Sequence, residues 1–276
     1  MNYVKVTIPI KNTEHSDILI AILATEGYDG FEETDNELKA FIPEQAYDVS
    51  VLAAMILPFN ITYHTELIEQ QNWNAKWESS FEPVTVNDFA MVRASFHEAK
   101  TGVKHDIIIT PKMSFGTGHH ATTYMMIEQM GMLDLKNKSV LDFGTGTGVL
   151  AILAEKMGAA SVRAIDNDDW SIENAKENII ANHCSRIQLE KAEVIPSNEQ
   201  YDIILANINL NVICNNMEII SKACRNVGTT ILLSGFLKSD EQEISRYLGQ
   251  YGNKVIAIQQ KGEWLSVKAV AKVGNV

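Results

Sequence analysis

The chain has 276 residues, which is enough for one large domain or for a large and a small one. Its apolar content of 46% and charged content of 21% are those of an ordinary globular protein, and its formal net charge of −12 disfavours strong attraction to nucleic acid or to an anionic membrane. Its three cysteines form no CxxC pair, so they indicate neither a zinc site nor a disulfide framework, and they fit a reducing cytoplasm.

The first 67 residues have the pattern of a small α+β domain. No basic leader followed by a long apolar core is present, and the apolar run at 49–59 is too short to span a bilayer, so we expect a cytoplasmic protein without a membrane partner. The order strand, helix, strand, strand, helix, strand predicts a ferredoxin-like domain over residues 1–67. Strands are predicted at 3–9, 28–33, 38–42 and 61–67, and helices at 14–25 and from Pro43 to about Leu57.

Residues 68–104 are predicted to be a linker helix and a connecting segment. Trp73 and Trp77 are four residues apart, so they would lie on one face of a short helix. An aromatic pair at this spacing is more often a packing contact than a ligand site, which favours a contact between domains.

Residues 105–276 show strands alternating with helices, the pattern of a doubly wound sheet. The last two strands are joined through Lys261, Gly262 and Glu263, which predicts a hairpin and therefore an antiparallel last strand. Strands are predicted at 105–110, 139–143, 162–166, 187–191, 202–206, 229–234, 254–260 and 264–270, and helices at 122–132, 149–157, 171–182, 211–224 and 240–251.

The stretch LDFGTGTGVL, residues 141–150, places glycines between a buried strand and a helix, where backbone can approach a ligand closely. It does not match the dinucleotide fingerprint, because Val149 stands at the third glycine position, and no Gly-Lys-Ser/Thr of a P-loop follows. Taken alone, the run leaves a structural turn or another nucleotide open.

Two polar side chains follow at the ends of later strands. Asp166 lies at the end of a predicted strand, where a carboxylate can accept hydrogen bonds from both ribose hydroxyls. A helix cap is the alternative for Asp166, although Asp168 and Asp169 are better placed for capping. Asn207 ends the strand of YDIILANIN and is expected at the same rim of the sheet.

A second glycine-rich segment, MSFGTGHHATT, occupies residues 113–123. His119 and His120 are adjacent and lack metal-ligand spacing, so we expect no metal site. Hydroxyl groups at a helix start satisfy free N–H groups, so a capping role is open for Thr117, Thr122 and Thr123.

The glycine turn, the acid after the second strand and the asparagine motif together resemble the class I S-adenosylmethionine-dependent methyltransferases. Through nearly the whole chain, FGTGxHxTT, DFGxGxG, IDxD and ANI resemble the PrmA family, which methylates a large-subunit ribosomal protein. Departures are mild: Thr145 and Thr147 stand where cysteine and serine are common. The resemblance implies cofactor contacts by Thr123, Gly144, Asp166 and Asn207, to which we add Gly146 and Phe115 as predicted cofactor-binding residues.

The resemblance implies methyl transfer from S-adenosylmethionine to lysine side chains and the N-terminal amine of that ribosomal protein. Asn207 is the candidate catalytic residue, because its side-chain carbonyl can orient an amine lone pair. We expect a monomer that does not recognise nucleic acid by sequence. The alternatives are a methyltransferase acting on RNA or a small molecule, and a ribosome-binding protein without catalytic activity.

Overall fold

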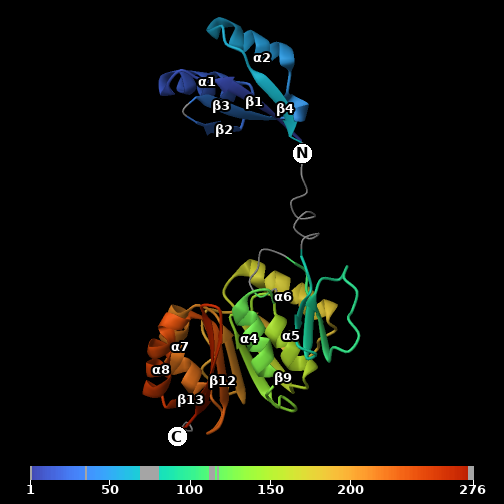
Figure 1. The fold of residues 1–276 in the computed structure, drawn as a ribbon, viewed down its shortest axis with the longest axis vertical. Coiled ribbons are helices and arrows are strands. Elements are labelled where there is room, and N and C mark those ends of the chain that lie inside the picture. Colours follow the sequence, from blue (N-terminus) through green and yellow to red (C-terminus); the bar gives the residue numbers. More distant parts are fainter. Residues whose placement is uncertain (1, 35, 69–80, 112–115, 117, 273–276) are drawn as a thin grey trace. The chain divides into compact units, whose positions relative to one another are not determined.

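The computed structural model describes residues 2–34, 36–68, 81–111, 116 and 118–272. The chain divides into two compact units, residues 1–80 and residues 81–276 (Figure 1). Each unit has its own hydrophobic core. Among the described residues, no helix is both long and apolar enough to cross a membrane.

The N-terminal unit contains an antiparallel sheet of order β2-β3-β1-β4, with the predicted sequence order of strands and helices. Alternate residues of β1 are buried, because Val4, Val6 and Ile8 face the helices and pack into the core with Leu19 and Leu52. The bounds are β1 Tyr3–Pro9, α1 Thr13–Thr25, β2 Gly30–Glu33, β3 Glu37–Pro43, α2 Val49–Ile56 and β4 His64–Ile68.

The second helix of this unit is shorter than predicted. Pro43 ends β3 instead of starting a helix, and a single 3₁₀ turn, Glu44–Ala46, follows it. The helix α2 begins at Val49 because the Asp48 carboxylate caps it, accepting hydrogen bonds from the backbone N–H groups of Ser50 and Val51. The sequence prediction missed this capping aspartate.

The second unit is built on a seven-stranded sheet of order β10-β9-β8-β11-β12-β14-β13. Strand β14 lies antiparallel between β12 and β13, which confirms the predicted antiparallel last strand. The neighbours β10, β9, β8, β11 and β12 are parallel, so their carboxyl ends meet at one edge. The bounds are β8 Ser139–Phe143, β9 Ser161–Asp166, β10 Ile187–Lys191, β11 Ile203–Asn207, β12 Thr230–Leu237, β13 Asn253–Lys261 and β14 Trp264–Ala271.

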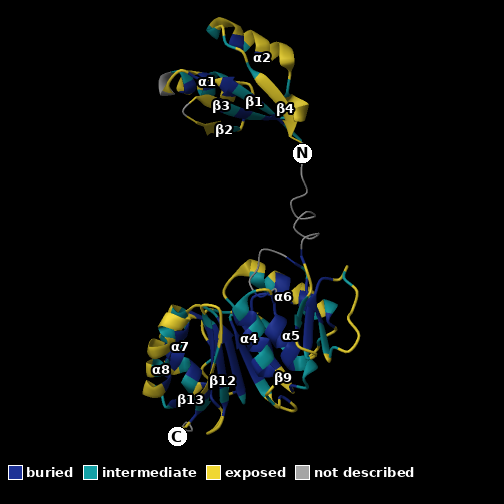
Figure 2. Ribbon diagram, viewed as in Figure 1, coloured by how far each residue is buried: buried dark blue, intermediate teal, exposed yellow. Residues whose placement is uncertain are grey.

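Helices cover both faces of this sheet, and its central strands β8, β11 and β12 are buried, whereas the edge strands β10 and β13 are largely exposed or half-buried (Figure 2). One face packs against α4 and α5, and the other packs against α7 and α8. Helix α6 follows β9 and contacts β9 and β10. The bounds are α4 Ala121–Met130, α5 Val149–Lys156, α6 Asp169–Ala181, α7 Leu210–Lys222 and α8 Glu241–Gln250, close to the predicted helices.

The structure corrects the prediction that residues 105–110 form a strand of the large sheet. They form β7 (His105–Ile108) in a separate three-stranded sheet with β5 (Val84–Val86) and β6 (Ala90–Arg93). This small sheet packs on the helical layer, because Ile107 and Ile109 join the core cluster of α4 and α5. The predicted connecting segment 68–104 therefore contains two strands of the second unit, which begins at Phe81. Trp73 and Trp77 lie outside the described residues.

Candidate functional site

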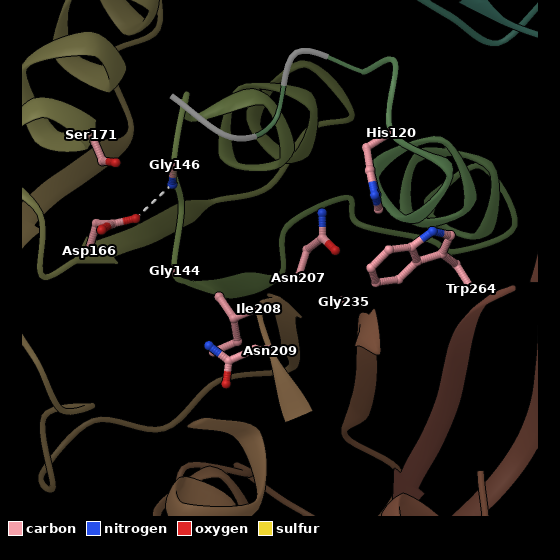
Figure 3. A pocket seen from close by; sticks show the side chains of 10 residues that line it. All are labelled: His120, Gly144, Gly146, Asp166, Ser171, Asn207, Ile208, Asn209, Gly235 and Trp264. Carbon is pink, nitrogen blue, oxygen red and sulfur yellow. Dashed lines mark hydrogen bonds between the residues drawn. The ribbon is translucent and has the colours of Figure 1, made fainter. Parts of the chain in front are cut away.

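A pocket opens where the parallel strands of the second unit end, the usual ligand site of an open α/β sheet (Figure 3). Its volume of about 380 Å³ is within the range of roughly 300–1,000 Å³ that is typical of small-molecule sites. Its lining residues are His120, Gly144, Gly146, Asp166, Ser171, Asn207, Ile208, Asn209, Gly235 and Trp264.

Two of the lining glycines leave room for Ile208. A β-carbon on Gly144 would lie 2.2 Å from Cγ2 of Ile208, and the φ of Gly144 is +75°. A β-carbon on Gly235 would lie 2.2 Å from the carbonyl oxygen of Ile208, at a φ of +100°. Residues with side chains rarely adopt such φ values, so both positions require glycine. Glycine is therefore required at position 144 for a second reason besides the predicted ligand contact, which is the close approach of Ile208.

The buried side chain of Asp142 stabilises the glycine turn, residues 144–148, through two hydrogen bonds. Its Oδ2 accepts a hydrogen bond from Thr145 Oγ1 at 2.6 Å and another from the Ala151 N–H at 3.2 Å. Burial raises the pKa of Asp142 to about 7, an effect that these two hydrogen bonds oppose and that the nearby Asp166 carboxylate reinforces. Thr145, noted above as a departure from the family pattern, is thus part of the support of the turn.

Asp166 lies at the end of β9 with its carboxylate against the glycine turn. Its Oδ2 accepts from the Gly146 N–H at 2.8 Å, and its Oδ1 accepts from the Asp168 N–H at 3.1 Å. Asp168 caps α6 through Ser171, so Asp166 is not the cap. A carboxylate oxygen can accept more than one hydrogen bond, so Asp166 keeps acceptor capacity toward the pocket.

Asn207 lies at the tip of β11, and only the nitrogen of its side-chain amide has a hydrogen-bond partner among the described residues. Its Nδ2 donates to Thr123 Oγ1 at 3.1 Å. Its buried Oδ1 has no hydrogen-bond partner among the described residues. Figure 3 shows this oxygen on the side of the pocket where Trp264 lies. A buried polar oxygen without a partner is unfavourable unless a ligand supplies a donor.

Thr123 lies behind Asn207 and does not line the pocket. It is fully buried, and its hydroxyl fixes the orientation of the Asn207 amide. A direct contact between Thr123 and the cofactor stays a prediction.

His120 and Trp264 form an aromatic wall beside Asn207. Their ring centroids are 4.4 Å apart in an edge-to-face arrangement. His120 caps α4, accepting from the Thr122 N–H, and burial lowers its pKa, which favours the neutral ring. Among the described residues, no group of three or more His, Cys, Asp or Glu side chains could hold a metal ion.

The structure brings Gly144, Gly146, Asp166 and Asn207 to one pocket, whereas Phe115 lies outside the described residues. The sequence interpretation missed Gly235 and Trp264. Gly235 lies within β12, where the pairing with β14 shifts register between Ser234 and Phe236, and a glycine directly after the buried run ILLS is the signal that could have identified it.

The residues present fit S-adenosylmethionine. Gly144 and Gly146 present backbone to the pocket, and the Asp166 carboxylate is an acceptor for ribose hydroxyls. The partnerless Oδ1 of Asn207 is an acceptor for an N–H group. Both protein groups are acceptors. They match a nucleoside whose ribose hydroxyls donate to Asp166, together with an amino group that donates to Asn207.

Comparison with known proteins gives one family over almost the whole chain. The family model of ribosomal protein L11 methyltransferase (PrmA) matches residues 6–272. A ribosomal protein L11 methyltransferase of Phocaeicola vulgatus is 35% identical over 282 residues, covering 99% of this chain and 100% of that protein. One of Chlorobaculum parvum is 38% identical over 266 residues, covering 91% of this chain and 90% of that protein.

A solved structure shares the fold. The ribosomal protein L11 methylase of Lactobacillus delbrueckii subsp. bulgaricus matches with a TM-score of 0.64 and 24% identity, covering 70% of this chain and 100% of that one. A methyltransferase of Pyrococcus furiosus has a TM-score of 0.50 at 20% identity, covering 61% of this chain and 90% of that one. At these identities the likeness shows the fold, and it confirms the predicted class I methyltransferase architecture.

Proposed function

Because the chain belongs to the ribosomal protein L11 methyltransferase (PrmA) family, we propose that it transfers methyl groups from S-adenosylmethionine to amino groups of ribosomal protein L11. The family membership confirms the resemblance read from the sequence. Lysine side chains and the N-terminal amine of L11 are the acceptors we propose. The single observation that carries this proposal from the site itself is the buried Oδ1 of Asn207, which has no partner among the described residues.

The cofactor would lie across the glycine turn. Asp166 would accept from the ribose hydroxyls, while Gly144 and Gly146 would present backbone to the nucleoside. When bound, S-adenosylmethionine supplies an electrophilic methyl group on a sulfonium. The protein's task is then to orient the acceptor in line with that group and to exclude water.

Asn207 would act on the acceptor amine. Its Nδ2 is held by Thr123, so its Oδ1 is left to accept a hydrogen bond from an amine N–H. Such a bond fixes the direction of the nitrogen lone pair, which must point at the methyl group. Asn207 would thereby be the catalytic residue of the site.

The acceptor must be neutral to react. Deprotonating a lysine with a reference pKa near 10.4 costs about 4–5 kcal/mol at pH 7. His120 and Trp264 present aromatic surface beside Asn207. These rings also exclude water from the acceptor, and loss of water disfavours the ammonium form and so reduces that cost.

We assign recognition of L11 to the N-terminal unit. Residues 1–80 carry 13 acidic and 4 basic side chains, so most of the chain's net charge of −12 lies there. An acidic surface attracts a basic protein and speeds the encounter. The protein would work as a monomer in the cytoplasm, without sequence-specific contact with nucleic acid.

The test is methyl transfer from labelled S-adenosylmethionine to purified ribosomal protein L11, with ribosomal RNA and a small-molecule extract in parallel reactions. We expect label in L11, at lysine and N-terminal amines by mass spectrometry. Label in RNA or in a small molecule alone would replace the proposed substrate. Cofactor binding without transfer to any of the three would indicate a non-catalytic ribosome-binding role.

A further inference from the structure

Thr147 connects the two glycine-rich segments of the chain. Its Oγ1 donates a hydrogen bond to the carbonyl oxygen of Gly116 at 2.8 Å. Its own carbonyl oxygen accepts from Nδ2 of Asn178, also at 2.8 Å. Thr147 is fully buried and does not line the pocket. A single hydroxyl thus joins the segment of Gly116 to the turn that follows β8.

Two asparagines of α6 extend this contact. Asn178 donates to Asn174 Oδ1 at 2.7 Å and accepts from the Thr110 N–H at 2.7 Å, while Asn174 donates to the Thr110 carbonyl at 3.4 Å. Both asparagines are fully buried. We call Thr147, Asn174 and Asn178 the Thr147 cluster. It holds Thr110 and Gly116, which lie on the two sides of Phe115 in the sequence.

The fit between Gly116 and Thr147 is close. A β-carbon on Gly116 would lie 2.8 Å from the Thr147 hydroxyl oxygen, and the φ of Gly116 is +108°. The hydroxyl therefore lies where any other residue at 116 would place its side chain. In such a buried cluster, losing one partner leaves the other group unsatisfied, which is unfavourable.

The Thr147 cluster is connected along the chain to two groups of pocket-lining residues. On one side, Gly116 is four residues before His120, which lines the pocket. On the other side, Thr147 is the neighbour of Gly146, whose N–H is bound by Asp166. Movement of Thr147 relative to Gly116 would therefore change the spacing between these two groups.

We propose that Thr147, supported by Asn178, is a positioning residue for cofactor binding: through its bond to Gly116 it sets the spacing between His120 and the glycine turn without touching the cofactor. This rests on the proposed function only in taking S-adenosylmethionine as the ligand. The effect belongs to binding, because Thr147 contacts no group that we assign to the transfer step.

The test uses the full-length protein and the variants Thr147→Val and Thr147→Ser. Valine keeps the shape and removes the donor, whereas serine restores the hydroxyl. Calorimetry with S-adenosylmethionine should show Kd raised at least about tenfold in Thr147→Val and within about threefold of wild type in Thr147→Ser. The KM for the cofactor should rise with Kd, while kcat at saturating cofactor stays within about threefold. Should Thr147→Val fail to fold, Thr147→Ala replaces it with the same expectation.

Asn182→Ala is the matched control. Asn182 is the C-cap residue of α6 and bonds both backbone groups of Ile108 and the backbone carbonyl of Asn178, with no bond to Thr147, Gly116 or the Asn178 side chain. Its loss should lower Tm and leave Kd within about twofold. A Kd raised less than about tenfold in Thr147→Val, or an equal rise in Asn182→Ala, would overturn the inference. Wild-type protein that binds the cofactor but does not label L11 would overturn the proposed function alone, because the Kd comparison still applies.

Discussion

The side chain of Ile208 fills the space above Gly144, with Cγ2 only 2.2 Å from where a β-carbon on that glycine would stand. The backbone of Ile208 approaches Gly235 equally closely. Ile208 directly follows Asn207, so the two glycines allow the tip of β11 to fit between the β8 turn and β12. That fit places the Asn207 amide at the pocket.

Ile208→Ala should relieve the effect of an alanine at Gly144 but not that of an alanine at Gly235. Gly144→Ala should lower the free energy of unfolding by about 2–4 kcal/mol, through overpacking and positive φ. Combining it with Ile208→Ala should recover about 1–2 kcal/mol in a double-mutant cycle, because the clash is with a side chain. Gly235→Ala should show no such recovery, since its clash is with the Ile208 backbone. Urea unfolding of the single and double variants measures both, and equal coupling for the two glycines would contradict this account.

Asp166→Ala should weaken S-adenosylmethionine binding by about 2–4 kcal/mol, because the ribose acceptor and the Gly146 contact are both lost. The fold should be retained. Asp168→Ala is the control: it removes the α6 cap, lowering stability by about 1 kcal/mol, and leaves affinity unchanged. Calorimetric affinity of Asp166→Ala within threefold of wild type would contradict the assignment.

Asn207→Ala should reduce kcat by about 100-fold, because the acceptor amine loses its orienting contact. Asn209→Ala provides the comparison at a neighbouring lining position. Asn209 Oδ1 caps α7 through the Val212 N–H, so its loss should lower stability by about 1 kcal/mol with kcat nearly unchanged. Steady-state kinetics at saturating cofactor separates the two, and similar kcat values for both variants would exclude a catalytic role for Asn207.

The buried carboxyl of Asp142 should make stability depend on pH. Its pKa is raised by burial from 3.8 to about 7 in the folded protein. Between these values the folded state retains a proton that the unfolded state releases, so this group's contribution to stability falls as pH rises from 4 to 7 and is constant above 7. Relative to Asp142→Asn, wild type should lose about 2–4 kcal/mol over this window. Denaturation series at several pH values measure it, and parallel curves for the two proteins would contradict the shift.

A fragment of residues 81–276 should fold and bind S-adenosylmethionine, because it contains the whole pocket and its own core. It should fail on ribosomal protein L11 if residues 1–80 recognise that substrate. Equal kcat/KM for the fragment and the full chain would place recognition in the second unit. Circular dichroism and calorimetry of the fragment confirm that any loss is not caused by unfolding.

The parallel part of the sheet and three strand-end residues could be predicted because their signals are local. Buried runs of β-branched and aliphatic residues mark β8, β9 and β11, and parallel strands bring Gly144, Asp166 and Asn207 to one edge whatever the loops between them do.

Other features depend on contacts distant in sequence. Strands β5 and β6 are only three and four residues long, too short for a periodic signal, and they form because β6 pairs with β7 and β5 with β6. Trp264 reaches the pocket because a hairpin reverses the chain, so the start of β14 meets the ends of the parallel strands. The Thr147 and Gly116 contact joins residues 31 positions apart, which no local pattern reports.

The place of β14 between β12 and β13 has a consequence for synthesis on the ribosome. Chains emerge with their N-terminal part first, so β12 is made before the strand that pairs with its open side. Until Trp264–Ala271 has left the exit tunnel, β12 is an unprotected edge that can pair with other chains, and Trp264 is absent from the pocket. Premature termination between β12 and β14 would therefore yield an aggregation-prone product with an incomplete pocket, instead of a smaller working enzyme.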